Sequence, residues 1–198
     1  MQIPTKRACF ELIRDMEMLD HIVAHSVVVC RVALLLTDKI MSTGNMLNRD
    51  LVQASALLHD ITKTRSFETG ELHSETGCLL LIDKGFTETG AIVRQHVKLD
   101  VYFTSETVTE AEIVNYADKR VLHDRIVSMD ERMQYILETY GNDEAKRGLL
   151  LKLWEESKRV EKRIFKNISI NPWEVGDLIG RDGQASELAI YRKICSDC

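Results

Sequence analysis

The sequence of 198 residues contains only two prolines and ten glycines, and no low-complexity tract or linker interrupts it. Segments that connect independent domains are usually rich in such residues. With 44% hydrophobic residues, the chain is long enough to fill one core. We therefore expect a single domain over residues 1–198.

The sequence also lacks an excess of positive charge. Its 31 aspartates and glutamates outnumber its 26 lysines and arginines, which gives a net charge of -5. Tight binding to duplex nucleic acid requires a basic surface that neutralises phosphates, so we expect no such partner. A small anionic substrate that binds at a local metal centre is compatible with this charge.

No apolar run in the sequence is long enough to cross a bilayer. The longest, Val27 to Leu36, is interrupted by Arg31, whereas a membrane-spanning helix needs about 20 apolar residues. The first residues also lack the hydrophobic region of a secretion signal. We expect a soluble, cytoplasmic protein that does not bind membranes.

The number of cysteines, five, is odd, and without an export signal it indicates reduced thiols rather than a disulfide framework. Cys195 and Cys198 form a lone C-x-x-C pair. Because no second pair is present to complete a four-ligand zinc site, we assign no metal or redox function to these two residues.

Apolar residues recur at helical spacing along most of the chain, which predicts an all-α fold. Residues 64–72 are polar and contain Gly70, so we expect a loop there. Beyond residue 172 we expect only a short amphipathic helix, around 188–194. The other expected helices cover residues 1–20, 21–41, 48–60, 73–84, 87–96, 109–128, 130–140 and 143–167.

The segment from Ala54 to Lys63 ends an apolar helix with an adjacent histidine and aspartate. His59 lies eight residues after Leu51 and therefore shares its buried face, and Asp60 follows at the helix end. An imidazole beside a carboxylate suits a divalent metal ion. The alternative is a histidine satisfied within the core, next to a helix-terminal aspartate.

Other potential ligands also lie on apolar helix faces. His25 shares its face with several valines and leucines, although His21, one turn earlier, remains an alternative. His73 and His96 lie at the ends of expected helices. Asp118 falls among apolar residues, where a carboxylate is costly unless a metal or a cation such as Arg125 meets it.

The order His25, His59-Asp60, His73, His96 and Asp118 resembles the HD-domain superfamily of metal-dependent phosphohydrolases. Within it, residues 57–63 (Leu-Leu-His-Asp-Ile-Thr-Lys) resemble the HDIG variety, and residues 115–119 (Asn-Tyr-Ala-Asp-Lys) resemble its tyrosine-alanine-aspartate-lysine segment. The resemblance implies a single-domain helical bundle with an HD core at about 20–128 and a C-terminal helical extension at about 129–198.

The resemblance also implies the roles of these residues. His25, His59, Asp60 and Asp118 would bind one metal ion, and His73 and His96 would bind a second ion bridged by Asp60. Thr62 stands where the HDIG variety usually has glycine. Because threonine does not share the conformational freedom of glycine, this departure predicts a different shape for the loop that carries Lys63.

This set of ligands is suited to hydrolysis. A divalent ion held by imidazoles and carboxylates lowers the pKa of a bound water to about 7, and the resulting hydroxide can attack phosphorus. The ligands are compatible with one or two ions of Mn, Fe, Co, Ni or Zn, and less readily with Mg.

We therefore expect a metal-dependent phosphohydrolase, a phosphomonoesterase or phosphodiesterase, acting on a nucleotide or another small phosphate ester. Asp60 and Lys63 are the expected catalytic residues. Lys63, with its ammonium group toward the phosphate and not toward the metal, would bind substrate together with Lys119 and with Arg94 or Arg120. The alternatives are a di-iron oxygenase of the same fold and a metal-binding sensor without turnover. The sequence leaves the oligomeric state open.

Overall fold

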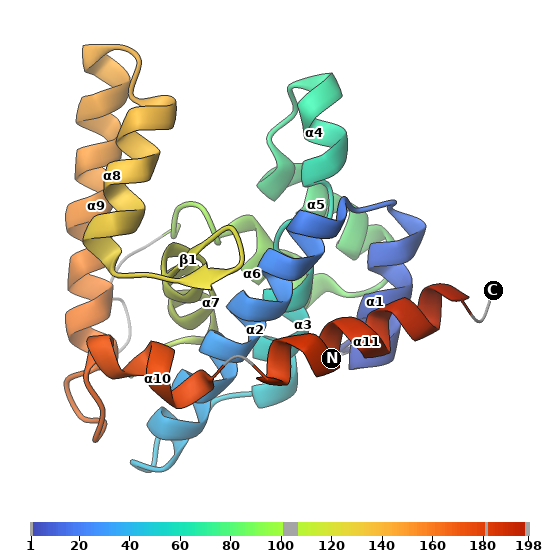
Figure 1. Ribbon diagram of the computed structural model, residues 1–198, viewed down its shortest axis with the longest axis horizontal. Coiled ribbons are helices and arrows are strands. Elements are labelled where there is room, and N and C mark those ends of the chain that lie inside the picture. Colours follow the sequence, from blue (N-terminus) through green and yellow to red (C-terminus); the bar gives the residue numbers. More distant parts are fainter. Residues whose placement is uncertain (1, 101–106, 181, 197–198) are drawn as a thin grey trace.

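Helix α2 (Asp20–Met41) runs through the centre of the protein in a computed structural model that describes residues 2–100, 107–180 and 182–196. It packs against α3 (Arg49–Leu58) and α7 (Glu110–Lys119) (Figure 1). By length and composition α2 could cross a membrane, but 67% of its most apolar window is buried inside the protein. Its apolar character is therefore explained by its place in the core.

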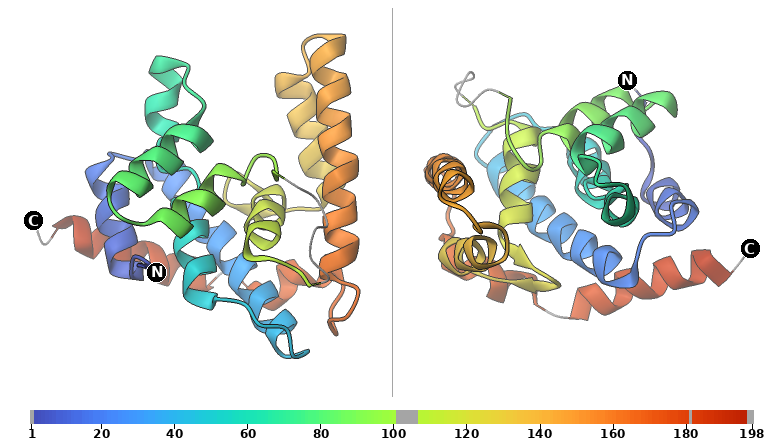
Figure 2. Two further views of the ribbon diagram at one scale, coloured as in Figure 1. Left: turned by 180° about the vertical axis from the view of Figure 1, so that it is seen from behind. Right: turned by 90° about the horizontal axis from the view of Figure 1, so that it is seen from above.

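The first helix is shorter than expected, and the last is longer. Helix α1 (Lys6–Asp15) begins where the Thr5 side chain accepts a hydrogen bond from the backbone N–H of Ala8, and the chain turns at Glu17, whose φ is +50°. Helix α11 (Asp182–Ser196) lies across α1 and α2 (Figure 2). Cys198 lies outside the described residues, so the C-x-x-C pair has no structural account.

The segment expected to be a loop contains helix α4 (Lys63–Thr69), so that expectation is wrong. None of its residues is fully buried, and Gly70 ends it with a φ of +69°. The helix has no apolar face toward the core and therefore leaves no periodic signal in the sequence.

Helices α5 (His73–Asp83) and α6 (Thr87–Arg94) follow and pack closely on each other. A Cβ atom on Gly90 would lie 2.9 Å from the carbonyl oxygen of Cys78, so a side chain cannot be accommodated there without movement. Gly85, with a φ of +85°, follows the end of α5, where glycine tolerates the left-handed backbone conformation.

The expected helix over residues 109–128 is interrupted. It begins at the expected position with a capping box formed by Thr109 and Glu112, but α7 ends at Lys119. An antiparallel hairpin of β1 (Val121–Leu122) and β2 (Arg125–Ile126) follows, with His123 at a φ of +56°. A two-residue strand is too short to show its own periodicity, which is why the apolar pattern indicated a continuous helix.

The remaining chain forms a helical hairpin that projects beyond the core (Figures 1 and 2). Its helices, α8 (Met129–Tyr140) and α9 (Glu144–Ile164), pack side by side. A 3-10 helix (Pro172–Glu174) and α10 (Val175–Ile179) then lead to α11. The all-α fold is confirmed, with the two short strands as its only sheet within the described residues.

Candidate metal centre

Three buried histidines are held in the same way by backbone carbonyl groups. The Nδ1 atom of His25 lies 2.8 Å from the His123 oxygen, that of His59 lies 2.8 Å from the Ala56 oxygen, and that of His96 lies 2.6 Å from the Val93 oxygen. A carbonyl oxygen can only accept, so each Nδ1 atom carries the proton. In the neutral ring each Nε2 atom then has a free lone pair, as a metal ligand requires, whereas in the protonated ring Nε2 donates toward a carboxylate.

The Nε2 atoms of His25 and His59 face two carboxylates. His25 Nε2 lies 3.1 Å from Asp118 Oδ1. The His59 atom lies 3.4 Å from Asp60 Oδ2 and 3.7 Å from Asp118 Oδ1. Asp118 comes from the last turn of α7, so residues almost a hundred positions apart meet here. Among the described residues its ion partners include these histidines but not Arg125, which is exposed on β2.

The other oxygen of Asp60 faces a second pair of histidines. Asp60 Oδ1 lies 3.2 Å from His73 Nε2 and 3.5 Å from His96 Nε2, and the two Nε2 atoms are 3.1 Å apart. Two groups of three potential ligands therefore share Asp60: His25, His59 and Asp60, and Asp60, His73 and His96.

These residues fit a divalent ion. Ligand atoms at about 2.1 Å from one ion stand roughly 3.0 to 3.5 Å from each other, close to the separations observed here. His59 Nε2 and Asp60 Oδ1 are buried and have no hydrogen-bond partner. Because a lone pair facing a carboxylate oxygen is repulsive without a cation between them, a metal ion would satisfy both atoms.

The electrostatics of the cluster favour the ligand forms of its carboxylates. Burial alone would raise the pKa of Asp60, but the charges of His59 and Lys63 outweigh burial and hold this pKa well below its usual value. Burial would also raise the pKa of Asp118, but a hydrogen bond from the His25 ring and the charge of His59 outweigh burial and lower this pKa. Burial lowers the pKa of His96, which favours its neutral form.

Lys63 is placed differently from the expectation. Its ammonium group donates to Asp60 Oδ2 over 2.7 Å, so it points toward a candidate metal ligand. Burial would lower the pKa of Lys63, but Asp60 outweighs burial and the pKa is raised. The cause is the start of α4 directly after Thr62, which brings Lys63 within one turn of Asp60.

Thr62 does not need the conformation of glycine. Its φ is -107°, and its hydroxyl lies 2.8 Å from the His73 carbonyl oxygen and 2.9 Å from Thr76 Oγ1. Helix α5 approaches this segment closely at Gly77, where an added Cβ would lie 3.2 Å from side-chain carbons of Ile61 and of Val93. This close approach, which the glycine permits, holds the start of α5 and therefore His73 against Asp60.

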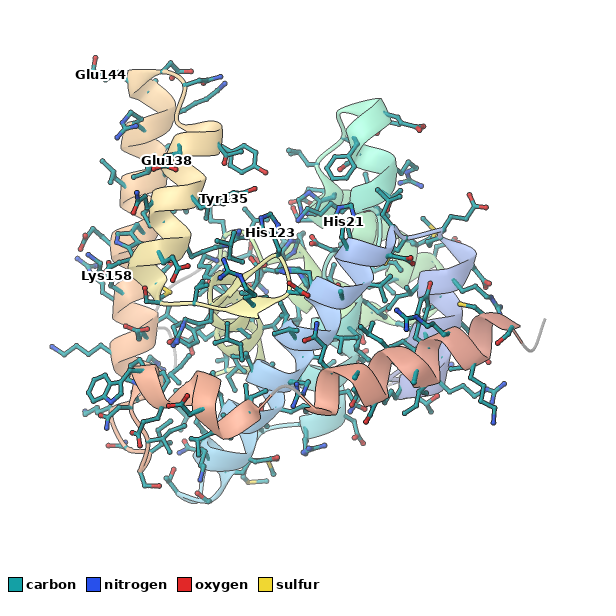
Figure 3. All side chains as sticks on the ribbon, viewed as in Figure 1. His21, His123, Tyr135, Glu138, Glu144 and Lys158 are labelled. Atoms are coloured by element: carbon teal, nitrogen blue, oxygen red, sulfur yellow. The ribbon has the colours of Figure 1, made fainter. Side chains whose placement is uncertain are left out.

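The other expected cations have partners within the protein. Lys119 donates to the carbonyl oxygens of His96, Val97 and Asn115 over 3.1 to 3.2 Å, and burial lowers its pKa to about 8. Arg94 forms an ion pair with Asp100. Arg120 is buried and donates to the backbone. His21 is exposed at the first turn of α2, outside both ligand groups (Figure 3).

The structure adds two residues that the sequence did not indicate. Arg132 of α8 lines the same cavity as His73, His96 and Asp118, and its Nε atom is buried without a hydrogen-bond partner. His123 holds His25 through its carbonyl group, and its ring contacts Tyr135 of α8 with centroids 5.5 Å apart (Figure 3). Both residues belong to segments whose position depends on the tertiary structure.

A cavity of about 370 Å³ opens beside the ligand cluster. It lies between α4 on one side and the α8–α9 hairpin on the other, the two elements that project in the same direction in Figure 1. The residues at its inner end include Lys63, His73, His96, Asp118 and Lys119. A ligand in this cavity would therefore contact the candidate metal centre.

The fold and the cluster define an all-α protein that can hold divalent ions between histidines and carboxylates. The family model of the HD domain matches residues 22–121, and the chain belongs to this family. Proteins with this domain are mostly metal-dependent hydrolases. No curated protein and no solved structure matches the chain significantly. The HDIG variety stays a prediction.

Proposed function

We propose that the protein is a phosphohydrolase that cleaves a phosphomonoester or phosphodiester with a metal-activated water. The observation that carries this proposal is the sharing of Asp60 between two groups of ligands at one end of an open cavity. When bound there, two divalent ions would supply a hydroxide near pH 7 and would stabilise charge on the phosphate oxygens.

The chain provides two cations for the phosphate. Lys63 uses one of its three N–H donors on Asp60 and has others available for an anion. Arg132 approaches the cavity from the opposite element, α8, and its planar guanidinium can bind two phosphate oxygens. In this arrangement Lys119 holds the segment with His96 and Val97 in place, while Lys63 and Arg132 bind the substrate.

The first test is metal analysis of protein purified without chelator, followed by a screen of phosphate esters with Mn, Co, Ni, Fe and Zn. We expect up to two equivalents of metal and hydrolysis that a chelator abolishes. A protein that binds iron, shows a mixed-valence signal and consumes oxygen but cleaves no ester would be an oxygenase. A protein that binds metal without any turnover would be a sensor.

A further inference from the structure

The outer part of the cavity is almost entirely apolar. Met133 and Ile136 of α8 and Leu150, Leu153 and Trp154 of α9 line it, and we refer to these five residues as the apolar wall. Ile136 follows Met133 by three residues, and Leu153 and Trp154 follow Leu150 by three and four, so each helix turns one face toward the cavity. Phe67 of α4 faces them across the cavity and is 61% exposed.

The apolar wall and the metal centre belong to the same space. The cavity that the wall lines also reaches His73, His96 and Asp118. Arg132, directly before Met133, marks the change from charged to apolar lining along α8. A ligand with its phosphate at the metal centre would therefore extend the rest of its structure along the wall.

The wall offers few hydrogen bonds. Two serines line this part of the cavity, but Ser157 already donates to the Leu153 carbonyl over 2.8 Å, and Ser66 donates to the Lys63 carbonyl over 2.7 Å. Tyr140 adds a hydroxyl at the exposed rim, where its side chain is 57% exposed. A sugar or a nucleobase bound against this surface would lose hydrogen bonds to water without replacement.

We propose that the substrate is a phosphate ester of a compact apolar alcohol, alkyl or aryl, whose carbon part packs on the apolar wall. This inference rests on the proposed function and narrows it away from nucleotides. The volume of about 370 Å³ is near the lower end of the roughly 300–1,000 Å³ typical of ligand pockets, so it suits a compact group.

The test has a binding arm and a turnover arm. The binding arm compares methyl-, butyl- and 3-hydroxypropylphosphonate on Mn-loaded protein and follows the fluorescence of Trp154, which lines the cavity. The protein carries Trp173→Phe, because Trp173 is 75% exposed outside this cavity and would add a signal of its own. Three added methylenes should tighten binding of the butyl compound about fiftyfold over methyl. The hydroxypropyl compound should bind close to methyl. The corresponding alkyl phosphates should show the same order in kcat/KM.

Matched variants on α9 assign the preference to the wall. Leu150→Asn should lower the preference for butyl over hydroxypropyl about tenfold or more. Leu151→Asn, which alters the neighbouring leucine that is 47% exposed and outside the cavity, should keep the full preference. Circular dichroism checks that both variants are folded.

The possible failures are distinguishable. Equal affinities for butyl- and hydroxypropylphosphonate, or hydrolysis of esters without apolar preference, would overturn the inference and leave the proposed function intact. Apolar preference in binding without hydrolysis of any ester would instead refute the proposed function. If no phosphonate binds and the protein is a dimer that Leu150→Asn dissociates, the wall is covered by a second copy and the inference is wrong.

Discussion

Asp60 connects the two halves of the candidate metal centre because its oxygens face different partners. Oδ1 lies 3.2 Å from His73 and 3.5 Å from His96, whereas Oδ2 lies 3.4 Å from His59 and 2.7 Å from Lys63. The side chain is only 1% exposed, so these partners take the place of water. A substitution at this single position therefore removes a ligand from both groups.

We expect Asp60→Ala to lose metal at both positions and to lower turnover by more than about a hundredfold, since loss of even an outer partner of a ligand costs 10- to 100-fold. The protein should keep its helical content, because the core beneath Asp60 is apolar. Metal content and circular dichroism measure these effects, with Asp83→Ala, an exposed position, as the control. Full turnover in Asp60→Ala would rule out this mechanism.

His73 and His96 should belong to one metal position and His25 and His59 to the other. We expect His73→Ala and His96→Ala each to lower the metal content from two equivalents toward one at saturating Mn or Fe, and to reduce turnover. Titration of metal-free protein measures the stoichiometry. If the wild type saturates at one equivalent and both variants match it, the centre is mononuclear and these histidines serve substrate binding or packing.

Arg132 should act on the substrate and not on the metal. We expect Arg132→Gln to lower kcat/KM for phosphate esters about 30-fold, equivalent to about 2 kcal/mol for hydrogen bonds to a charged group, with unchanged metal content. Arg132→Lys should recover part of the loss, because it keeps the charge without the planar fork. Arg125→Gln, which removes an exposed arginine outside the cavity, should have kinetics like those of the wild type.

Individual ligands could be predicted from the sequence where they lie on a regular helix face. His25 and His59 share buried faces with apolar residues, so their direction follows from helical spacing. Arg132 gave no such signal, because an arginine on an amphipathic helix usually faces solvent. The direction of Lys63 also required the structure, since it depends on a helix that sequence periodicity did not show.

At the scale of elements, long helices could be predicted and short elements could not. The bounds of α2 and α3 lie within two residues of the expected ones, and the Asn48 side chain caps α3 by accepting a hydrogen bond from the Leu51 N–H. Helix α4 and the β1–β2 hairpin are each too short to form a periodic pattern. Both lie beside the metal centre, and the hairpin supplies the carbonyl that holds His25.

The close contact between α5 and α6 gives a prediction about stability. Gly90→Ala should destabilise the protein by about 1–3 kcal/mol, because the new Cβ would lie 2.9 Å from a backbone oxygen of α5. Gly148 lies in helix α9, where an added Cβ would meet no atom of a neighbouring element within 4 Å. Gly148→Ala should therefore stabilise the protein by about 0.5–1 kcal/mol. Urea denaturation of the metal-free proteins measures both effects. Equal shifts for the two variants would contradict the packing argument.

At the scale of the molecule, the C-terminal part serves two different purposes. The α8–α9 hairpin forms one side of the cavity, while α11 returns to the core and buries Tyr191 and Ile194 against it. The ring of Tyr191 contacts that of Phe10 in α1, with centroids 5.7 Å apart. The sequence showed helices in this region but no chemistry, because the cavity forms only when the hairpin folds next to α4 and α7.

The buried charges should make the metal-free protein sensitive to acid. The pKa values of Asp60 and Asp118 are lowered in the folded state, so below their ordinary value of about 4 the unfolded chain binds more protons than the folded protein. The stability that these carboxylates contribute is complete above pH 4 and is lost as the pH falls through the lower folded values. The lowered pKa of His96 adds a loss of stability that begins below its ordinary value of about 6.5. The raised pKa of His59 adds stability that is lost only as the pH rises above about 6.5, so it does not offset this loss.

We therefore expect the melting temperature of chelator-treated protein to fall between pH 6.5 and 4 and to fall more steeply below pH 4. In Asp118→Asn the steep part should be weaker, because one of the two carboxylates responsible for it no longer binds a proton. Asp83→Asn, at an exposed position, should follow the wild-type curve. Thermal unfolding from pH 3 to 7 measures all three. If the curves of the wild type and Asp118→Asn are parallel below pH 4, Asp118 is not an ionised carboxylate held by His25 and His59 in the folded protein.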